Sequence, residues 1–197
     1  MPAKNKTPVN EIFQLEVTLL GSDPPIWRRL LVPASLTLAA LHSVLQIAMG
    51  WDSSHMHEFR KGKQFYGIPN PEERFFNVPR TIDDRKVRLA DVLLRVGSNF
   101  VYTYDMGDSW EHAIVLEKRL PVDPNLKYPA CLGGERACPP EDCGGIYGYY
   151  DLLEAIQDPE HPQHEEQLEW VGEEWNPDAF SLDDVNQWLH GRRRRTT

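Results

Sequence analysis

Long apolar segments are missing from this chain of 197 residues. No run approaches the ~20 consecutive apolar residues that a transmembrane helix requires. Residues 1–10 are polar and lead into no apolar segment, so the sequence predicts a flexible N-terminus and no secretory signal. Cysteine is also scarce, and three thiols, an odd number, fit a reducing compartment better than a disulfide framework. We therefore expect a cytoplasmic protein that does not enter a membrane.

Basic residues are missing from one long section of the chain. From Glu141 to His190 there are fourteen Asp and Glu and no Lys or Arg, within a net charge of −9. Nucleic-acid phosphates must be met by clustered cations, so this section argues against duplex binding. The run Arg192–Arg195 is either a nucleic-acid arm or a tail that lies on the acidic surface, and we favour the tail. Nucleic acid is therefore not an expected partner.

The first ordered segment is predicted to be a hairpin. Residues 11–20 alternate between apolar and polar side chains, which is typical of a half-buried strand. Residues 26–32 form the second strand, and the glycine and prolines of residues 21–25 supply the turn. Arg28 and Arg29 in the second strand suggest that one of its faces lies near water.

A helix is expected after the hairpin, with Ser35 or Thr37 as its cap, an apolar stripe that runs to Met49, and Gly50 beyond its end. The same criteria predict strands at 55–59, 64–66, 99–104 and 110–120, a loop at 69–86, a short helix at 89–96, and C-terminal helices at 149–157, after Pro162 and after Ser181. This order predicts one α+β domain over residues 11–190. Its sheet is mostly antiparallel or mixed, begins with the hairpin, is covered by the first helix and is compatible with a β-grasp-like start. Residues 146–190 form an acidic helical appendage packed on that domain, and residues 191–197 form a basic tail.

All three cysteines lie in one segment, Cys131–Gly145. Pro139 and Pro140 lack a backbone N–H, and paired glycines are costly to order, so the segment is predicted to be neither a helix nor a central strand. We interpret it as a shaped loop, which we call the Cys loop.

Three segments concentrate polar side chains that an ordinary core does not need. They are His55-x-His57, the turn Asp105-x-x-Asp108 with His112 beyond it, and the Cys loop with Glu141 and Asp142. On a strand His55 and His57 point the same way, so we expect the three segments to surround one concavity. The candidate ligand-binding residues are His55, His57, Tyr104, Asp105, Asp108, Trp110, His112, Glu141, Asp142 and Tyr149.

At these residues the chain resembles a known family. The segments Tyr104–His112 and Cys138–Tyr149 look like those of the plasmid pRiA4b Orf-three-like family. So do Ile26–Arg29 ahead of the first helix and His55-x-His57-x-Phe59 after it. The resemblance covers roughly residues 10–190.

The resemblance implies an α+β protein of bacteria or archaea without a settled biochemical activity. Some members are labelled insertion-element passenger proteins of resolvase type, which implies a mobile-element DNA protein. A serine recombinase needs an activated serine among arginines that hold phosphate. The candidate residues here are Asp, Glu and His on an acidic chain, so we disfavour that role.

The cysteines raise the question of metal. Cys131, Cys138 and Cys143 have spacings of seven and five, which differ from the CxxC of zinc ribbons. A loop could still gather three thiolates around Zn²⁺ with a histidine as the fourth ligand. The alternative, which we favour, is three reduced thiols packed as small hydrophobic side chains.

The histidines and aspartates allow two interpretations. Two histidines on one strand face beside carboxylates form the ligand set of a metal-activated water, as in a metal-dependent hydrolase. Alternatively, Asp105 and Asp108 only stabilise the turn, and Trp110 and His112 belong to the edge of the core.

Aromatic side chains near these polar groups, among them Tyr104, Trp110 and Tyr149, suit a pocket for a small molecule or a protein segment. We therefore predict an uncharacterised binding or accessory protein without catalysis, with the metal-dependent hydrolase as the alternative.

Overall fold

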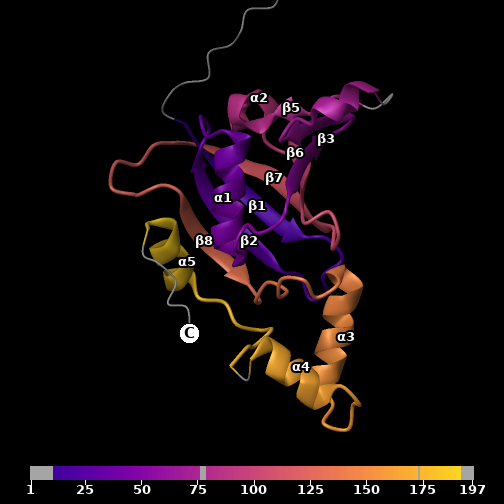
Figure 1. The fold of residues 1–197 in the computed structure, drawn as a ribbon. Coiled ribbons are helices and arrows are strands. Elements are labelled where there is room, and N and C mark those ends of the chain that lie inside the picture. Colours follow the sequence, from indigo (N-terminus) through magenta and orange to yellow (C-terminus); the bar gives the residue numbers. More distant parts are fainter. Residues whose placement is uncertain (1–10, 76–78, 173, 192–197) are drawn as a thin grey trace, which may run out of the picture.

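One open sheet dominates the fold. The computed structural model describes residues 11–75, 79–172 and 174–191, and within them eight strands lie in the order β5-β4-β3-β6-β7-β1-β2-β8 (Figure 1). Neighbouring strands are antiparallel except β4 and β5, which are parallel. The strands are β1 (Glu11–Leu19), β2 (Trp27–Pro33), β3 (His57–Lys61), β4 (Gln64–Gly67), β5 (Ile82–Asp83), β6 (Asn99–Tyr104), β7 (Trp110–Pro121) and β8 (Ala130–Glu135).

The N-terminal hairpin and its helix form as the sequence predicts. Phe13, Leu15 and Val17 of β1 are fully buried, so the alternating apolar face lies on the core. The helix α1 (Leu38–Met49) is capped by Thr37, whose hydroxyl accepts a hydrogen bond from Ala40 N at 3.2 Å. Its apolar side faces the sheet and covers one face of the central strands (Figure 1).

The region between α1 and β6 differs in detail from the prediction. The expected loop at residues 69–86 contains two 3₁₀ turns, η1 (Pro71–Phe75) and η2 (Asp84–Lys86), with the two-residue strand β5 before the second. The expected helix at 89–96 ends early, because α2 spans Leu89–Val92 only. Leu94 and Val96 are exposed, so an extension of the helix to residue 96 would not bury these apolar side chains.

The first part of the Cys loop is a strand, which corrects the prediction of a loop over all of Cys131–Gly145. Strand β8 pairs with β2 at the edge of the sheet. Gly133 and Gly134 resemble a turn in the sequence, but at Gly134 the packing leaves no room for a side chain. A Cβ on Gly134 would lie 2.7 Å from the Trp27 carbonyl oxygen and 2.8 Å from the Phe180 ring. On the outer side of β8, the Asn186 amide accepts from Cys131 N at 2.9 Å and donates to Cys131 O at 3.0 Å.

Arg28 corrects part of a second prediction: Arg29 on one face of β2 has a side chain that is 32% exposed, but Arg28 on the other face does not lie near water. Its side chain is 3% exposed, and its guanidinium donates to the carbonyl oxygens of Ala48, Trp27, Glu135 and Arg136. Ala48 lies in the last turn of α1, where the partial negative charge of the helix favours a cation. Backbone oxygens thus compensate a charge that the sequence suggests should be solvated.

Three helices complete the chain: α3 (Gly145–Gln157), α4 (His164–Val171) and α5 (Leu182–Leu189). Helices α3 and α4 pack on each other beyond one end of the sheet, and α5 returns beside β8 and α1 (Figure 1). Leu153 of α3 and Val185 of α5 join the core. The protein is therefore α+β, with one mostly antiparallel sheet and C-terminal helices.

None of the helices in the described residues is both long and apolar enough to cross a bilayer. The predicted flexible segment 1–10 and the arginines of the predicted basic tail lie outside the described residues.

Candidate functional site

The turn between β6 and β7 is held by its own aspartates. Asp105 and Ser109 both have a φ of 56°, a left-handed conformation that Asp tolerates better than most side chains. Asp105 Oδ1 accepts a hydrogen bond from Gly107 N at 2.8 Å. Asp108 Oδ2 accepts from Gly144 N at 3.1 Å, so this carboxylate ties the turn to the Cys loop.

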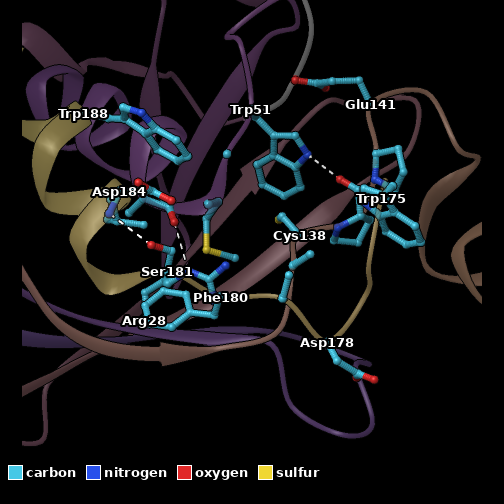
Figure 2. A pocket seen from close by; sticks show the side chains of 18 of the residues that line it. Arg28, Trp51, Cys138, Glu141, Trp175, Asp178, Phe180, Ser181, Asp184 and Trp188 are labelled. Atoms are coloured by element: carbon cyan, nitrogen blue, oxygen red, sulfur yellow. Dashed lines mark hydrogen bonds between the residues drawn. The ribbon is translucent and has the colours of Figure 1, made fainter. Parts of the chain in front are cut away.

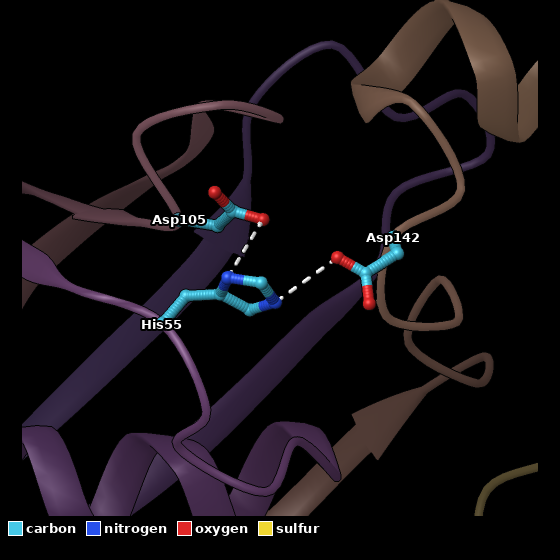
Figure 3. Close-up of side chains that lie close together, drawn as sticks. All are labelled: His55, Asp105 and Asp142. Carbon is cyan, nitrogen blue, oxygen red and sulfur yellow. Dashed lines mark ion pairs between the residues drawn. The ribbon is translucent and has the colours of Figure 1, made fainter.

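Three side chains from distant segments meet beside this turn (Figure 3). His55 Nδ1 lies 3.7 Å from Asp105 Oδ2, and His55 Nε2 lies 3.1 Å from Asp142 Oδ1. The side chains of Asp105, His55 and Asp142 are 10%, 29% and 71% exposed, so the group runs from the protein interior to solvent. We call His55, Asp105 and Asp142 the open cluster.

More negative charge lies close to the open cluster. The Tyr104 hydroxyl is 3.3 Å from His55 N, from which it accepts, and 3.1 Å from Glu141 Oε1, to which it donates. Burial, followed by the charge of Asp52, raises the pKa of Glu141. Within the described residues no Lys or Arg forms an ion pair with Glu141, Asp105 or Asp142. The site is thus an uncompensated concentration of carboxylates around one histidine.

His57 does not join this group. Strand β3 begins at His57, so His55 lies before the strand and the predicted common direction of the two side chains is wrong. His57 Nε2 lies 2.9 Å from Asp84 Oδ2, and its ring stacks on His42 with centroids 3.6 Å apart. His42 Nδ1 is 2.8 Å from the Tyr102 hydroxyl, to which Gln46 also donates at 2.9 Å. We call His42, Gln46, His57, Tyr102 and Asp84 the buried cluster.

The buried cluster keeps His42 neutral. Burial first, and the charge of His57 second, lower the pKa of His42 to about 4. Because Gln46 donates to the Tyr102 oxygen, the Tyr102 proton is available to His42 Nδ1. The sequence offered no chemistry for His42, and its partners could not be found from local spacing because they lie on α1, β3, β6 and η2.

Three further predicted residues belong to the core. Trp110, His112 and Tyr149 are at most 2% exposed. His112 Nδ1 is bonded to Trp110 O at 3.0 Å, and burial lowers the pKa of His112 to about 4. The turn and core interpretation therefore fits the surroundings of Trp110 and His112 better than a solvent-exposed ligand role.

The three cysteines do not come together. Cys131 lies in β8 and its thiol contacts Gly133 O at 3.4 Å, whereas Cys138 is buried beside the end of α1. Burial, followed by the charge of Asp108, raises the pKa of Cys143 to about 12. In the part of the chain that the structure describes, the one group of three side chains with metal-ligand spacing is His55, Asp105 and Asp142, not the cysteines.

A large cavity adjoins the Cys loop (Figure 2). Its volume is about 890 Å³, and it opens between the end of α1, residues 137–141 and the segment from Trp170 to Trp188. Its aromatic walls are Trp51, Trp170, Trp175, Phe180 and Trp188, and its carboxylates are Glu141, Asp178 and Asp184.

Sequence reasoning missed most of this cavity. The available signal was aromatic enrichment, because three tryptophans occur in a section that is otherwise acidic and polar. The cavity adjoins the Cys loop through Glu141, so it borders on the predicted pocket without containing His55 or Asp105.

Comparisons with known proteins agree with the resemblance seen in the sequence. Residues 11–184 match the family model described as plasmid pRiA4b ORF-3-like protein. The chain is 38% identical to the uncharacterized protein y4hQ of Sinorhizobium fredii, over 95% of this chain and 100% of that protein. It is also similar to the crystal structure of MM3350 from Methanosarcina mazei, a protein of unknown function, with a TM-score of 0.82 and 32% identity over 90% of this chain and 98% of the other. The solved relative therefore shares the fold over most of this chain, and the chain belongs to the plasmid pRiA4b ORF-3-like proteins.

Proposed function

We propose that this protein is a non-catalytic binding or accessory protein whose ligand enters the aromatic cavity beside the Cys loop. The observation that carries the proposal is the cavity itself. A concave site of about 890 Å³ with several indole walls and a few polar groups has the size and lining of small-molecule and peptide sites. Three cysteines without a disulfide among them suit a reducing compartment, so we propose that this role is in the cytoplasm.

The charges of the cavity favour a cationic ligand. Asp178 is paired with Arg136, but no ion pair with a Lys or Arg of the described residues compensates Glu141 or Asp184. The buried cation Arg28 donates four hydrogen bonds to backbone oxygens, so few of its N–H groups remain to bind an anion. Cations bind well over indole faces, and Trp170 and Trp175 are indoles in the lining of this cavity. The ligand class is therefore an apolar or aromatic body that carries an amine or guanidinium, such as a basic peptide side chain.

Three small probes of similar shape test this charge preference. Tryptamine, indole and indole-3-propionate carry a positive, no and a negative charge on the same ring. Ligand-observed saturation-transfer NMR with the full chain is expected to rank them tryptamine, then indole, then indole-3-propionate. Trp188→Ala should abolish the tryptamine signal, whereas Trp27→Ala, which removes an indole outside the cavity, should retain it. Equal signals from the three probes, or an unchanged signal in Trp188→Ala, would refute the proposal.

A second candidate function, metal-dependent hydrolysis, is favoured by the open cluster alone. One imidazole and two carboxylates are ligands that can hold a metal with positions left for water. Hydrolysis of p-nitrophenyl phosphate and p-nitrophenyl acetate, measured with and without added Zn²⁺, tests it. A metal-dependent rate that disappears in His55→Ala would replace the binding proposal, and no rate above background would remove this alternative.

A further inference from the structure

We propose that the open cluster is a binding site for a divalent transition-metal ion, Zn²⁺ in the first place. In this site His55 Nε2 and the Asp142 carboxylate are the ligands, and Asp105 orients the imidazole from its other edge. The inference is independent of the aromatic cavity, because neither His55, Asp105 nor Asp142 lines that cavity.

The ligand geometry is the first argument. Donor atoms on one tetrahedral Zn²⁺ lie about 3.3 Å apart, as follows from bond lengths of roughly 2.0–2.1 Å. His55 Nε2 and Asp142 Oδ1 are 3.1 Å apart in the structure, so both can contact one ion without a rearrangement of the chain. The Asp142 carboxylate is 71% exposed, which leaves room for water molecules as further ligands of the same ion.

An unused ring nitrogen is the second argument. His55 Nε2 is shielded from solvent and makes no hydrogen bond of normal geometry with any described residue, although Asp142 Oδ1 is close. Other buried atoms without a hydrogen bond in the described residues lie on Trp110, His112, Glu141 and Tyr149, but His55 Nε2 is the one that belongs to a group with metal-ligand spacing, where an ion can complete it. The His55 ring lies between the mostly buried carboxylate of Asp105 and the exposed carboxylate of Asp142, an arrangement that a bound metal ion would explain.

The position of Asp105 is the third argument. Histidine ligands usually face a carboxylate or carbonyl with their second nitrogen, which selects the tautomer that leaves the first nitrogen free for the metal. Asp105 Oδ2 stands 3.7 Å from His55 Nδ1, and its other oxygen is held by Gly107 N (Figure 3). At 3.7 Å Asp105 acts through its charge and not through a direct hydrogen bond, and in the proposed site it is a positioning residue that favours a proton on Nδ1 and leaves Nε2 for the metal.

The surrounding charge is the fourth argument. Asp52 and Glu141 add negative charge near the open cluster, and within the described residues no Lys or Arg is paired with either. Like charges gathered at one place repel each other, and a divalent cation removes this cost. One imidazole with carboxylates suits Zn²⁺ or Mn²⁺, and Zn²⁺ binds such donors more tightly.

Calorimetric titration of the untagged full chain with Zn²⁺, after chelator treatment and dialysis, tests the site. We expect one equivalent to bind. His55→Ala and Asp142→Asn should each weaken binding by more than about 100-fold, and Asp105→Asn by about 10–100-fold, the range for groups that support a ligand. His161→Ala and Asp151→Asn, which change the same residue types outside the cluster, should bind like the parent chain.

Co²⁺ substitution separates this site from one made by cysteines. The Co²⁺ complex is expected to show ligand-field bands without a thiolate-to-metal charge-transfer band. A thiolate band that disappears in Cys143→Ser, or unchanged affinity in both His55→Ala and Asp142→Asn, would overturn the proposal. Trp188→Ala, the variant that tests the aromatic cavity, should bind Zn²⁺ normally, so the two proposals fail separately.

Discussion

The buried cluster and the open cluster both combine histidine with aspartate, but the polar groups are satisfied in one cluster and not in the other. In the buried cluster His57 meets Asp84 at 2.9 Å, and His42 meets the Tyr102 hydroxyl at 2.8 Å. In the open cluster His55 stands between two carboxylates with one nitrogen that lacks a proper partner. A polar group that is satisfied inside the protein stabilises the fold, whereas one left without a partner is available to a ligand.

The difference lies in what surrounds each histidine and not in the sequence next to it. His55 and His57 are two residues apart, yet one belongs to each cluster. The strand starts between them, so His57 is fixed by the ladder of β3 while His55 follows the turn and the Cys loop. Stability measurements should therefore separate the two clusters clearly.

Asp84→Ala should give the largest loss of stability, about 3–5 kcal/mol in the free energy of unfolding. The carboxylate is 2% exposed, and its removal leaves the His57 ring nitrogen buried without its partner. Urea unfolding followed by tryptophan fluorescence measures the change. The neighbouring Asp83→Ala is the matched control and should lose less, because its partners Arg85 and Lys86 are exposed. Equal losses in the two variants would show that the buried contact between His57 and Asp84 contributes no more than an exposed one.

Gly145→Ala should follow, with a loss of about 2–4 kcal/mol. Gly145 has a φ of +71°, and an added Cβ would lie 2.5 Å from the Asp108 carbonyl oxygen, at the junction of the turn and the Cys loop. Gly97→Ala separates strain from clash, because Gly97 has a φ of +83° and open space around it. It should lose only about 1–2 kcal/mol. If both variants lose the same amount, the close approach to Asp108 is not a constraint.

Acidification should destabilise the protein through its buried histidines. Burial lowers the pKa of His112 to about 4, below the ~6.5 of an unfolded histidine, so between these values the unfolded chain binds a proton that the folded chain excludes. Stability is therefore lost as the pH falls, and His112 accounts for about 2 kcal/mol between pH 7 and pH 5.

The variant His112→Phe tests this assignment, because it cannot titrate. The free energy of unfolding at pH 7 and pH 5 should differ less in His112→Phe than in the parent chain. His161→Phe, at a partly exposed site outside the core, should keep the full pH dependence. An undiminished pH dependence in His112→Phe would assign the effect to other groups.

Asp142→Asn should have the smallest effect on stability, within about 0.5 kcal/mol in either direction. The carboxylate is 71% exposed and its neighbours Asp105 and Glu141 are also acidic, so its charge contributes little to the fold. Thermal unfolding without metal measures this, and Asp151→Asn on α3 is the surface control. A loss comparable to that of Asp84→Ala would mean that the open cluster is structural after all.

Much of the fold could be predicted because it follows local rules. Alternation in β1, the Thr37 cap and the glycine after α1 are signals carried by consecutive residues. Strand β8 was missed because Gly134 is required by its close contacts with Arg28, Trp27 and Phe180, which are far away in the sequence. The burial of Arg28 was missed for the same reason, since its acceptors on residues 48, 135 and 136 are brought to it by the fold.

The segments that form the candidate site were predictable, but the sequence did not show which of their residues join the open cluster and which lie in the buried cluster or the core. The sequence indicates that the His55 segment, the Asp105 turn and the Cys loop concentrate polar residues, and the structure brings His55, Asp105 and Asp142 together. That His57 and His112 point elsewhere depends on where β3 begins and on which face of β7 meets the core. The aromatic cavity depends on the return of the chain from α4 to α5, which no local pattern describes.

The contact between Asn186 and strand β8 has a consequence for solubility. An edge strand with free backbone groups is a template on which another chain can add a strand. The Asn186 amide binds both the N–H and the C=O of Cys131, so a side chain occupies a rung that a foreign strand would otherwise use. At the opposite edge β5 has only two residues, too few to template another strand. Helix α5 therefore protects the sheet from polymerisation, and a chain cut before Leu182 should form β-rich aggregates.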